Sequence, residues 1–286
     1  MPNRRELGYV SAGSTSTVYV STGIYGRATG GIGSPTAVTI SGVNYEYLTF
    51  NATGTLTVTT AGWFDYLAVG GGTGAAQFSN GSGGGGSGCL EIGSIYLSAN
   101  QTITIGAGGS FAGNNVTHSA GNTIIAATSP FGRTIGGGWY YLNGSSGANE
   151  LAVGGGGGSV AGGTSAVFTT AYGKNGGNST ATTNGGGGGS VNNVGGNGSG
   201  TTGGAAAAGF DVSVFIGGSA LYKAMGGGGG GSVTGGAAAT DGVAGSATTT
   251  PPNGNANSGG GGGGGAGVIT TGNGGNGICY IRWSVA

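Results

Sequence analysis

Trp63-Phe-Asp-Tyr-Leu-Ala-Val-Gly-Gly-Gly72 joins the two kinds of sequence from which this chain is built. Its first seven residues are mostly aromatic and aliphatic, as in a strand, and they end directly in a glycine block. Glycine fills 79 of the 286 positions, with long runs at 154–158, 185–189, 226–231 and 259–265. A residue without a Cβ atom loses the most backbone entropy on ordering and offers no side chain to bury. An ordered chain of this composition therefore needs an unusual architecture.

Other short segments alternate apolar and polar residues with a period of two, as half-buried strands do. The clearest in the first quarter of the chain are residues 16–22, 37–41, 45–50, 56–60 and 63–69. Further on, residues 89–97 and 101–106 are separated by the polar residues 98–100, a spacing that predicts a β-hairpin. No window of helix length shows a period of 3.6 residues. The sequence therefore predicts an all-β, β-sandwich-like fold with extensive glycine-rich loops and little or no α-helix.

The glycine runs have two interpretations, a flexible linker and an ordered packing element. Disordered chains usually combine low hydrophobicity with high charge. In this chain only 5% of the residues are charged and 8% are aromatic, so we expect the runs to be ordered. Polyglycine forms an extended helix with three residues per turn, and such helices pack closely enough for their backbones to hydrogen-bond. Packed polyglycine helices are therefore the expected form of these runs.

The charge content argues against two classes of protein. Seven Lys and Arg residues balance seven Asp and Glu residues, and no basic cluster is visible beyond Arg4 and Arg5. Nucleic-acid binding needs clustered positive charge, so we expect no nucleic-acid partner. The N-terminal residues lack the continuous apolar stretch of a signal peptide or membrane span. We therefore expect no membrane insertion.

Few residues are available for catalysis. The sole histidine, His118, lies in a polar, turn-like segment, and the seven carboxylates are scattered without a close pair. Residues 70–75 fit a dinucleotide-binding fingerprint, with Glu91 at a suitable distance, but that fingerprint needs a helix that the glycine-rich residues 76–86 cannot form. The sequence therefore predicts no enzymatic activity and no cofactor.

The two cysteines, Cys89 and Cys279, lie far apart in the chain and show no metal-ligand spacing. We expect no metal site. Two free, buried thiols are the simpler expectation, and a disulfide between the two cysteines is the alternative. Four aromatic residues lie in or beside glycine-rich segments, and they are the candidate surface-contact residues: Trp139, Tyr140, Tyr141 and Tyr172. Exposed on loop tips, they would stack on sugars or contact proteins. The alternative, which we favour, is that they cap small hydrophobic clusters between glycine layers.

Three segments, taken in order, resemble the glycine-rich domain of bacteriophage tail and tail-fibre proteins. They are Thr59-Thr-Ala-Gly-Trp-Phe-Asp-Tyr-Leu-Ala-Val-Gly-Gly-Gly72, Ile103-Thr-Ile-Gly-Ala-Gly-Gly109 and Gly274-Gly-Asn-Gly-Ile-Cys-Tyr-Ile-Arg-Trp283. The resemblance spans about residues 45–286 and departs from the pattern in long insertions at 110–150 and 205–225. It implies a glycine-rich β domain over residues 45–286, preceded by an attachment or assembly segment over residues 1–44.

The same resemblance implies a structural protein of the virion, most simply a tail fibre or surface-fibre adhesin that forms a homotrimer. Its partners would be other virion proteins, bound through the N-terminal segment, and a glycan or outer-membrane protein of the host surface. A capsid decoration or tail connector protein without receptor binding is one alternative. A polyglycine ice-binding protein is another, although the glycine register breaks in segments such as Gly200-Thr-Thr-Gly-Gly-Ala-Ala-Ala-Ala-Gly209.

Overall fold

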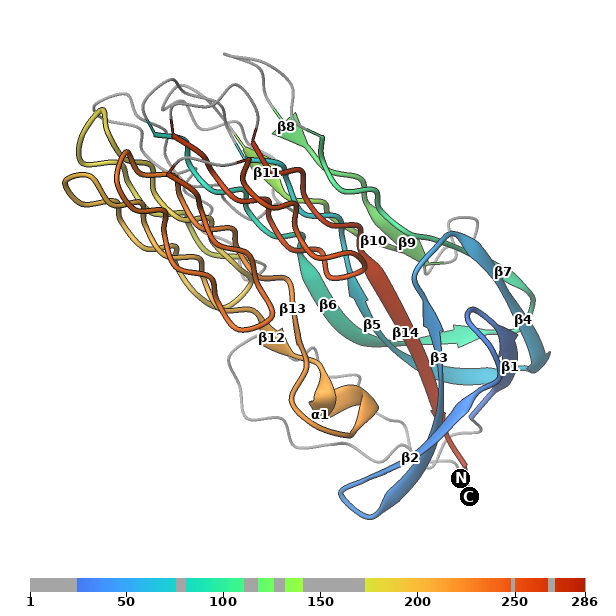
Figure 1. The fold of residues 1–286 in the computed structure, drawn as a ribbon. Coiled ribbons are helices and arrows are strands. Elements are labelled where there is room, and N and C mark those ends of the chain that lie inside the picture. The colour runs from blue at the N-terminus through green and yellow to red at the C-terminus, as the bar shows by residue number, and fades with distance from the viewer. Residues whose placement is uncertain are drawn as a thin grey trace.

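The computed structural model describes residues 25–75, 81–110, 118–125, 132–140, 173–247, 250–266 and 271–285. Figure 1 shows an elongated molecule in which a bundle of extended segments projects from a β-rich end. We call the β-rich end, which consists of the two large sheets and the segment that carries α1, the base, and we call the bundle the glycine array. The helix of the described residues, α1 (Ser213–Ile216), is a single turn. The prediction of an all-β fold with little or no α-helix is confirmed.

Two five-stranded antiparallel sheets form the base. The first contains, in spatial order, β2 (Thr36–Ile40), β3 (Val43–Phe50), β14 (Ile278–Ser284), β5 (Gly62–Val69) and β6 (Leu90–Leu97). The second contains β1 (Arg27–Gly30), β4 (Gly54–Thr60), β7 (Gln101–Thr104), β9 (Thr123–Ile125) and β10 (Arg133–Ile135). Two shorter ladders pair β8 (His118–Ser119) with β11 (Trp139–Tyr140) and β12 (Phe210–Asp211) with β13 (Tyr222–Lys223).

The alternating segments between residues 37 and 69 were predicted correctly, since they form β2, β3, β4 and β5. The predicted strand at 16–22 lies outside the described residues. Strands β1 and β2 precede the expected domain boundary at residues 44 and 45, and they pair with β4 and β3. Strands of residues 27–40 are therefore part of both sheets of the base, and the attachment role expected for residues 1–44 stays a prediction.

The predicted hairpin of residues 89–97 and 101–106 is wrong. Strand β6 pairs along its whole length with β5, while β7 pairs with β4 and β9 in the other sheet. The intervening residues carry the chain from one sheet to the other, and the side-chain oxygen of Asn100 accepts a hydrogen bond of 3.0 Å from the Val58 N–H of β4. Alternation marks the buried face of a strand, and both sheets bury one face in the same core, so the pattern did not distinguish between them.

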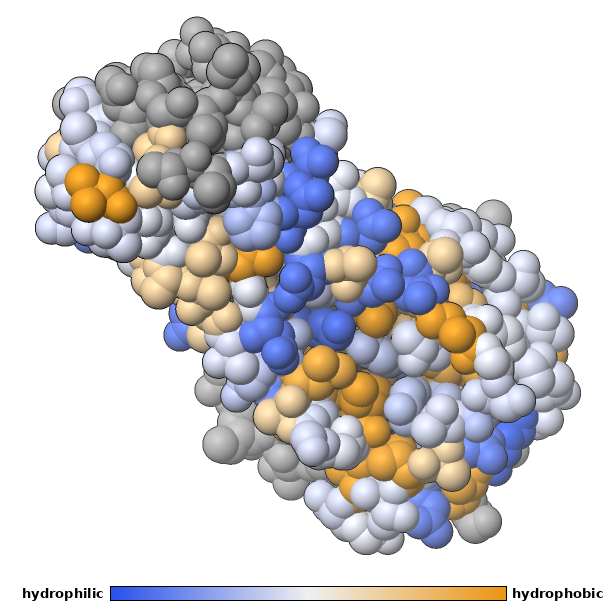
Figure 2. Space-filling view, in the orientation of Figure 1, coloured by the Kyte–Doolittle hydropathy of each residue, from blue (hydrophilic) through white to orange (hydrophobic). Residues whose placement is uncertain are grey.

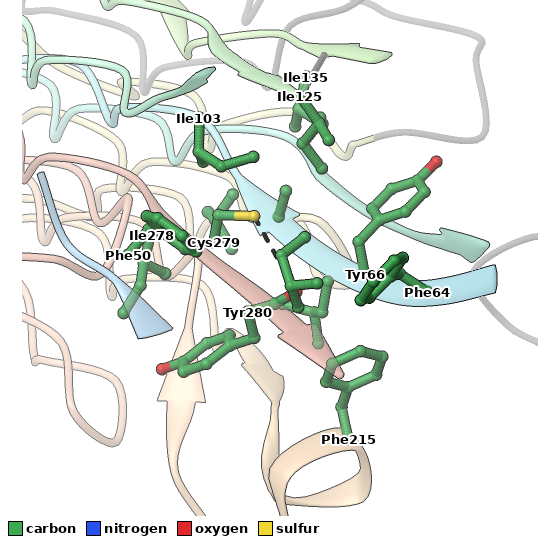
Figure 3. Packing of buried hydrophobic residues seen from close by; sticks show 14 of the residues in the cluster. Phe50, Phe64, Tyr66, Ile103, Ile125, Ile135, Phe215, Ile278, Cys279 and Tyr280 are labelled. Atoms are coloured by element: carbon green, nitrogen blue, oxygen red, sulfur yellow. Dashed lines mark hydrogen bonds between the residues drawn. The ribbon is translucent and has the colours of Figure 1, made fainter. Parts of the chain in front are cut away.

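The core of the base lies between the two sheets. Buried side chains of β5 and β14, including Phe64, Tyr66 and Cys279, meet Ile103 and Ile125 of the second sheet. Figure 3 shows these isoleucines on one side of the β14 ribbon and Tyr280 with Phe215 on the other. Strand β14 is buried on both faces, because α1 and its flanking residues cover the outer face of the first sheet.

Arg282 of β14 links the segment that carries α1 to the first sheet. Its guanidinium donates a hydrogen bond of 2.6 Å to the carbonyl oxygen of Phe215, and its Nε lies 3.4 Å from Asp65 Oδ2. The guanidinium carbon also lies 4.0 Å from the ring centre of Phe215 and 4.4 Å from that of Tyr45. A guanidinium that stacks on aromatic faces while it pairs with a carboxylate uses both binding modes of arginine. This cluster joins four elements, β3, β5, β14 and α1, around the nearly buried charge of Arg282.

Hydrogen bonds in the glycine array recur every third residue. The run at 226–231 shows the pattern most fully, and its N–H groups donate to three neighbouring segments. The donor and acceptor pairs are Gly226 to Ala207, Gly229 to Gly204, Gly227 to Gly85, Gly230 to Ser82, and Gly228 to Val243. A period of three is that of the polyglycine helix, in which successive residues point toward three different neighbours. The predicted packing of polyglycine helices is present in the described residues.

The carbonyl groups of residues 225–230 accept hydrogen bonds from three further segments. The donors are Gly185 and Gly188, Gly261 and Gly264, and Gly236. Six neighbours therefore surround this run, which leaves no room for side chains. A Cβ atom at Gly227 would lie 2.0 Å from the carbonyl oxygen of Gly262, and one at Gly84 would lie 2.0 Å from that of Gly227. Glycine is required here for close approach of backbones.

Where the array meets solvent, most outward positions carry side chains. Three neighbouring segments are linked by hydrogen bonds from Gly196 to Ala205 and from Ala206 to Ala237. An exposed position recurs every third residue in each segment, with Ser199 and Ala238 exposed in addition: Val194, Asn197 and Gly200; Thr202, Ala205 and Ala208; Thr234, Ala237 and Thr240. The register continues through residues 200–209, where the sequence suggested a break, because alanine at an outward position faces solvent instead of a neighbouring backbone.

Candidate functional site

The four candidate aromatic residues are only partly described. Trp139 and Tyr140 form β11, which pairs with β8, where His118 lies. Tyr141 and Tyr172 lie outside the described residues. In Figure 1, β8 and β11 lie beside the glycine array, away from the large sheets. The two alternatives for the aromatic side chains, contact with a ligand and capping of small hydrophobic clusters, both stay predictions.

Tyr66, Glu91 and Arg133 form an ionisable cluster in the base. The Tyr66 hydroxyl donates to a Glu91 carboxylate oxygen, and Arg133 Nε donates to the Tyr66 hydroxyl oxygen at 3.0 Å. Burial, and then the hydrogen bond to Glu91, raise the pKa of Tyr66 far above its ordinary value. A Cβ atom at Gly93 would lie 2.6 Å from the Tyr66 hydroxyl, so glycine leaves room for the ring. The cluster joins β5 and β6 of the first sheet to β10 of the second and is a structural tie.

The two cysteines and Asp211 also serve the packing and hydrogen bonding of the fold. Burial raises the pKa of the Cys89 thiol to about 12, with a smaller contribution from Glu91, and burial raises that of Cys279 further. Both cysteines are buried thiols that form no disulfide, as expected, and both are protonated near neutral pH. At Asp211, burial raises the carboxyl pKa, but hydrogen bonds from the backbone N–H groups of Leu221 and Ser213 outweigh it and lower the pKa.

Within the described ranges, no group of three His, Cys, Asp or Glu residues is placed to hold a metal ion. In the same part of the chain, no helix has the length and apolar character to cross a membrane.

The end of the glycine array opposite the base carries a surface built from three turns. Residues 203–208 and 226–231 connect to β12 and β13 at the base, so the turns at their other ends, 199–202 and 232–234, lie far from it. The run at 185–189 is antiparallel to 226–231, with Gly185 bonded to Gly230 and Gly188 to Gly227, so residues 179–183 reach the same end. We call residues 179–183, 199–202 and 232–234 the distal surface.

Hydrogen bonds join the three turns into one unit. The Ser232 N–H donates to the Thr183 carbonyl oxygen at 2.9 Å, and the Val233 N–H donates to that of Thr201 at 3.1 Å. The Thr183 hydroxyl donates to the Gly200 carbonyl oxygen at 2.7 Å. Because each turn bonds to another, the surface is preorganised rather than a set of independent loops.

Asn184 lies beneath the distal surface and contacts two of the turns through its side chain. Asn184 is fully buried, and its side-chain Nδ2 donates to the Gly200 carbonyl oxygen at 2.8 Å. Its Oδ1 accepts a hydrogen bond of 3.1 Å from the Thr180 N–H. A Cβ atom at Gly198 would lie 2.3 Å from this oxygen, so the neighbouring glycine makes room for the amide. The backbone of Asn184 also forms a β-bridge with Gly231, next to the third turn.

Sequence reasoning did not identify the distal surface or Asn184. The chain contains many Asn, Ser and Thr residues, and nothing local marks the few that meet at the end of the array. One available signal was the position of the turns, since each of the three borders a glycine-rich segment and contains hydroxyl residues.

The comparison with known families agrees with this architecture. The family described as a glycine-rich domain matches residues 48–284, a range that begins within β3 and covers all later strands and the whole described array. No curated protein matches the chain. Because the match spans most of the sequence and both of its structural parts, the chain belongs to the glycine-rich domain family.

Proposed function

We propose that this chain is a structural virion protein of a bacteriophage and a component of a tail fibre or surface-fibre adhesin. The observation that carries the proposal is the position of the two ends of the described chain. Tyr25 forms a β-bridge with Trp63 at the start of β5, and Arg27 Nη1 donates to the Ser284 carbonyl oxygen at 3.0 Å. Both ends therefore lie at the base, and the glycine array projects away from them (Figure 1).

This arrangement suits a protein that is attached at one end and makes contact at the other. In the proposal, residues 1–24 join the chain to other virion proteins, and the far end of the array meets a glycan or outer-membrane protein of the host. The dense backbone hydrogen bonding of the array supports a stiff projection, because each run is held by several neighbours. Three chains associate in the proposed particle, which adds buried surface to a small conventional core.

The proposal includes no catalytic role. Three carboxylates of the base serve the fold: Glu91 binds Tyr66, Asp65 binds Arg282, and Glu46 accepts from Trp283 Nε1 at 3.0 Å. An active-site carboxylate instead needs access to a substrate. These contacts support a structural role for the charged residues of the base.

Copy number and cell binding test the proposal. Purified virions are expected to contain a handful of copies at the tail, arranged with threefold symmetry, and the isolated protein is expected to block adsorption to sensitive cells. Light scattering is expected to give a trimer. Hundreds of copies on the capsid, together with no binding to cells, would contradict the fibre role and favour a decoration protein. A monomeric coil that proteases digest rapidly would contradict the structural role altogether.

One observation favours a second candidate, a polyglycine ice-binding protein. The outward positions of three neighbouring segments keep a three-residue register, including Thr202, Ala205 and Ala208 in the stretch where the sequence suggested a break. A regular, uncharged face is what this function needs. The measurement is thermal hysteresis of the purified protein, which this candidate requires and the fibre role does not. Substituting Ala205 with arginine is expected to abolish any hysteresis; its persistence would show that this face is not responsible.

A further inference from the structure

The chemistry of the distal surface restricts what it can bind. Exposed residues of its three turns are Thr180, Thr182, Ser199, Gly200, Thr201, Thr202, Ser232, Val233 and Thr234. The stretches that supply them, residues 175–210 and 224–240, contain no Asp, Glu, Lys, Arg or His. Figure 2 shows the same character more widely, since the described part of the array is mostly pale, with intermediate hydropathy, on the face in view.

We propose that the distal surface binds an uncharged polysaccharide, and this inference rests on the proposed adhesin role. A charged ligand would lose hydration on binding without gaining a partner of opposite charge, which is costly. Hydroxyl groups both donate and accept hydrogen bonds, as the hydroxyl groups of a sugar do. Val233, which is 68% exposed, adds an apolar contact between them.

The rigidity of the surface supports the same ligand. Single hydroxyl contacts are weak, so binding through them requires donors and acceptors that are already in place. Asn184 supplies this order, because its buried amide bonds to Gly200 and Thr180 and its backbone lies opposite Gly231 in a β-bridge. Asn184 is a positioning residue in this proposal, and the exposed hydroxyl groups contact the ligand.

The test uses the full-length protein and a panel of intact bacterial strains as the probe. Cell binding is measured for the wild type and for Thr182→Arg and Thr202→Arg, both at exposed positions of the distal surface. Thr240→Arg is the matched control, because Thr240 is also exposed but lies beside Asp241, whose carboxylate accepts from the Tyr222 N–H at the base. Melting curves of all variants are expected to coincide, since each replaced side chain faces solvent.

We expect the two distal variants to lose at least about tenfold in binding while Thr240→Arg binds as the wild type does. Periodate treatment of the cells, which cleaves vicinal diols of sugars, is expected to abolish binding, and protease treatment is expected to leave it intact. Raising the salt from about 0.05 M to about 0.5 M is expected to change binding less than about twofold, because no charge is paired.

The outcomes separate this inference from the proposed function. Tighter binding of the arginine variants would indicate an anionic ligand and overturn the inference, as would loss of binding after protease treatment alone. Unchanged binding of both distal variants would place the contact elsewhere while the adhesin role stands. A protein that binds virions but no cell of a susceptible host would contradict the adhesin role itself, and with it this inference.

Discussion

Replacing Gly227 with alanine is expected to unfold the glycine array at temperatures where the wild type is stable. The new Cβ atom would lie 2.0 Å from the carbonyl oxygen and 2.6 Å from the carbonyl carbon of Gly262. Both are backbone atoms of a run that is itself bonded to several neighbours, so no side-chain rotation relieves the clash. Overpacking of a well-packed interior commonly costs about 1–3 kcal/mol. A clash between backbones of the glycine array is expected to cost at least the upper value of this range.

Circular dichroism and differential scanning calorimetry measure the change, and Gly54→Ala is the matched control. A Cβ atom at Gly54 meets its nearest neighbour, Phe50 Cδ1, at an ordinary 3.7 Å. The control is therefore expected to stay within about 1 kcal/mol of the wild type. If Gly227→Ala melted together with Gly54→Ala, the close packing of the array would be refuted.

Replacing Arg282 with methionine is expected to release the segment that carries α1 from the first sheet. Methionine keeps much of the apolar stem, but it leaves the Phe215 carbonyl oxygen and the Asp65 carboxylate without the guanidinium. Arg282 is only 9% exposed, so the loss resembles the breaking of a buried ion pair. Such changes cost about 3–5 kcal/mol when a charge is left without its partner. The lower end applies here, because Asp65 also accepts a hydrogen bond of 2.6 Å from the Ser94 hydroxyl.

Hydrogen exchange read by mass spectrometry localises this effect. Peptides from residues 210–224 are expected to exchange faster in Arg282→Met, whereas peptides from the array keep their protection. Arg282→Lys is the informative control, because lysine retains the charge but lacks the planar group that stacks on Phe215 and Tyr45. An intermediate result is expected for it. Equal protection of residues 210–224 in all three proteins would show that Arg282 does not hold this segment.

The base was largely predictable from sequence because its side chains carry the pattern. Leu48 and Phe50 are buried and alternate with the more exposed Tyr47 and Thr49 in β3, and the alternating segments between 37 and 69 are strands. The pattern failed where strands with the same alternation had to be assigned to a sheet, as with β6 and β7. Partner choice there depends on contacts such as that of Asn100 with Val58, which no local periodicity records.

The array was predictable as a kind of structure but not as an arrangement. A run of glycine indicates a polyglycine helix, since the backbone period follows from the missing side chain. The same missing side chain removes any feature that says which run lies beside which. Gly227 bonds to Gly85, and Gly261 to Met225, without any complementarity in the sequence. The distal surface follows from this arrangement, and for that reason it escaped sequence reasoning together with Asn184.

The three-residue register of the outer segments determines which substitutions this sequence tolerates during evolution. A substitution at a position such as Gly227 meets a neighbouring backbone, whereas one at Ala205 or Thr202 meets water. Substitutions in the array are therefore expected only at outward positions and in turns. Along the outer segments, related sequences are expected to show two invariant positions followed by one variable position. Selection is thus able to rewrite what the far end displays while the framework that holds it stays constant.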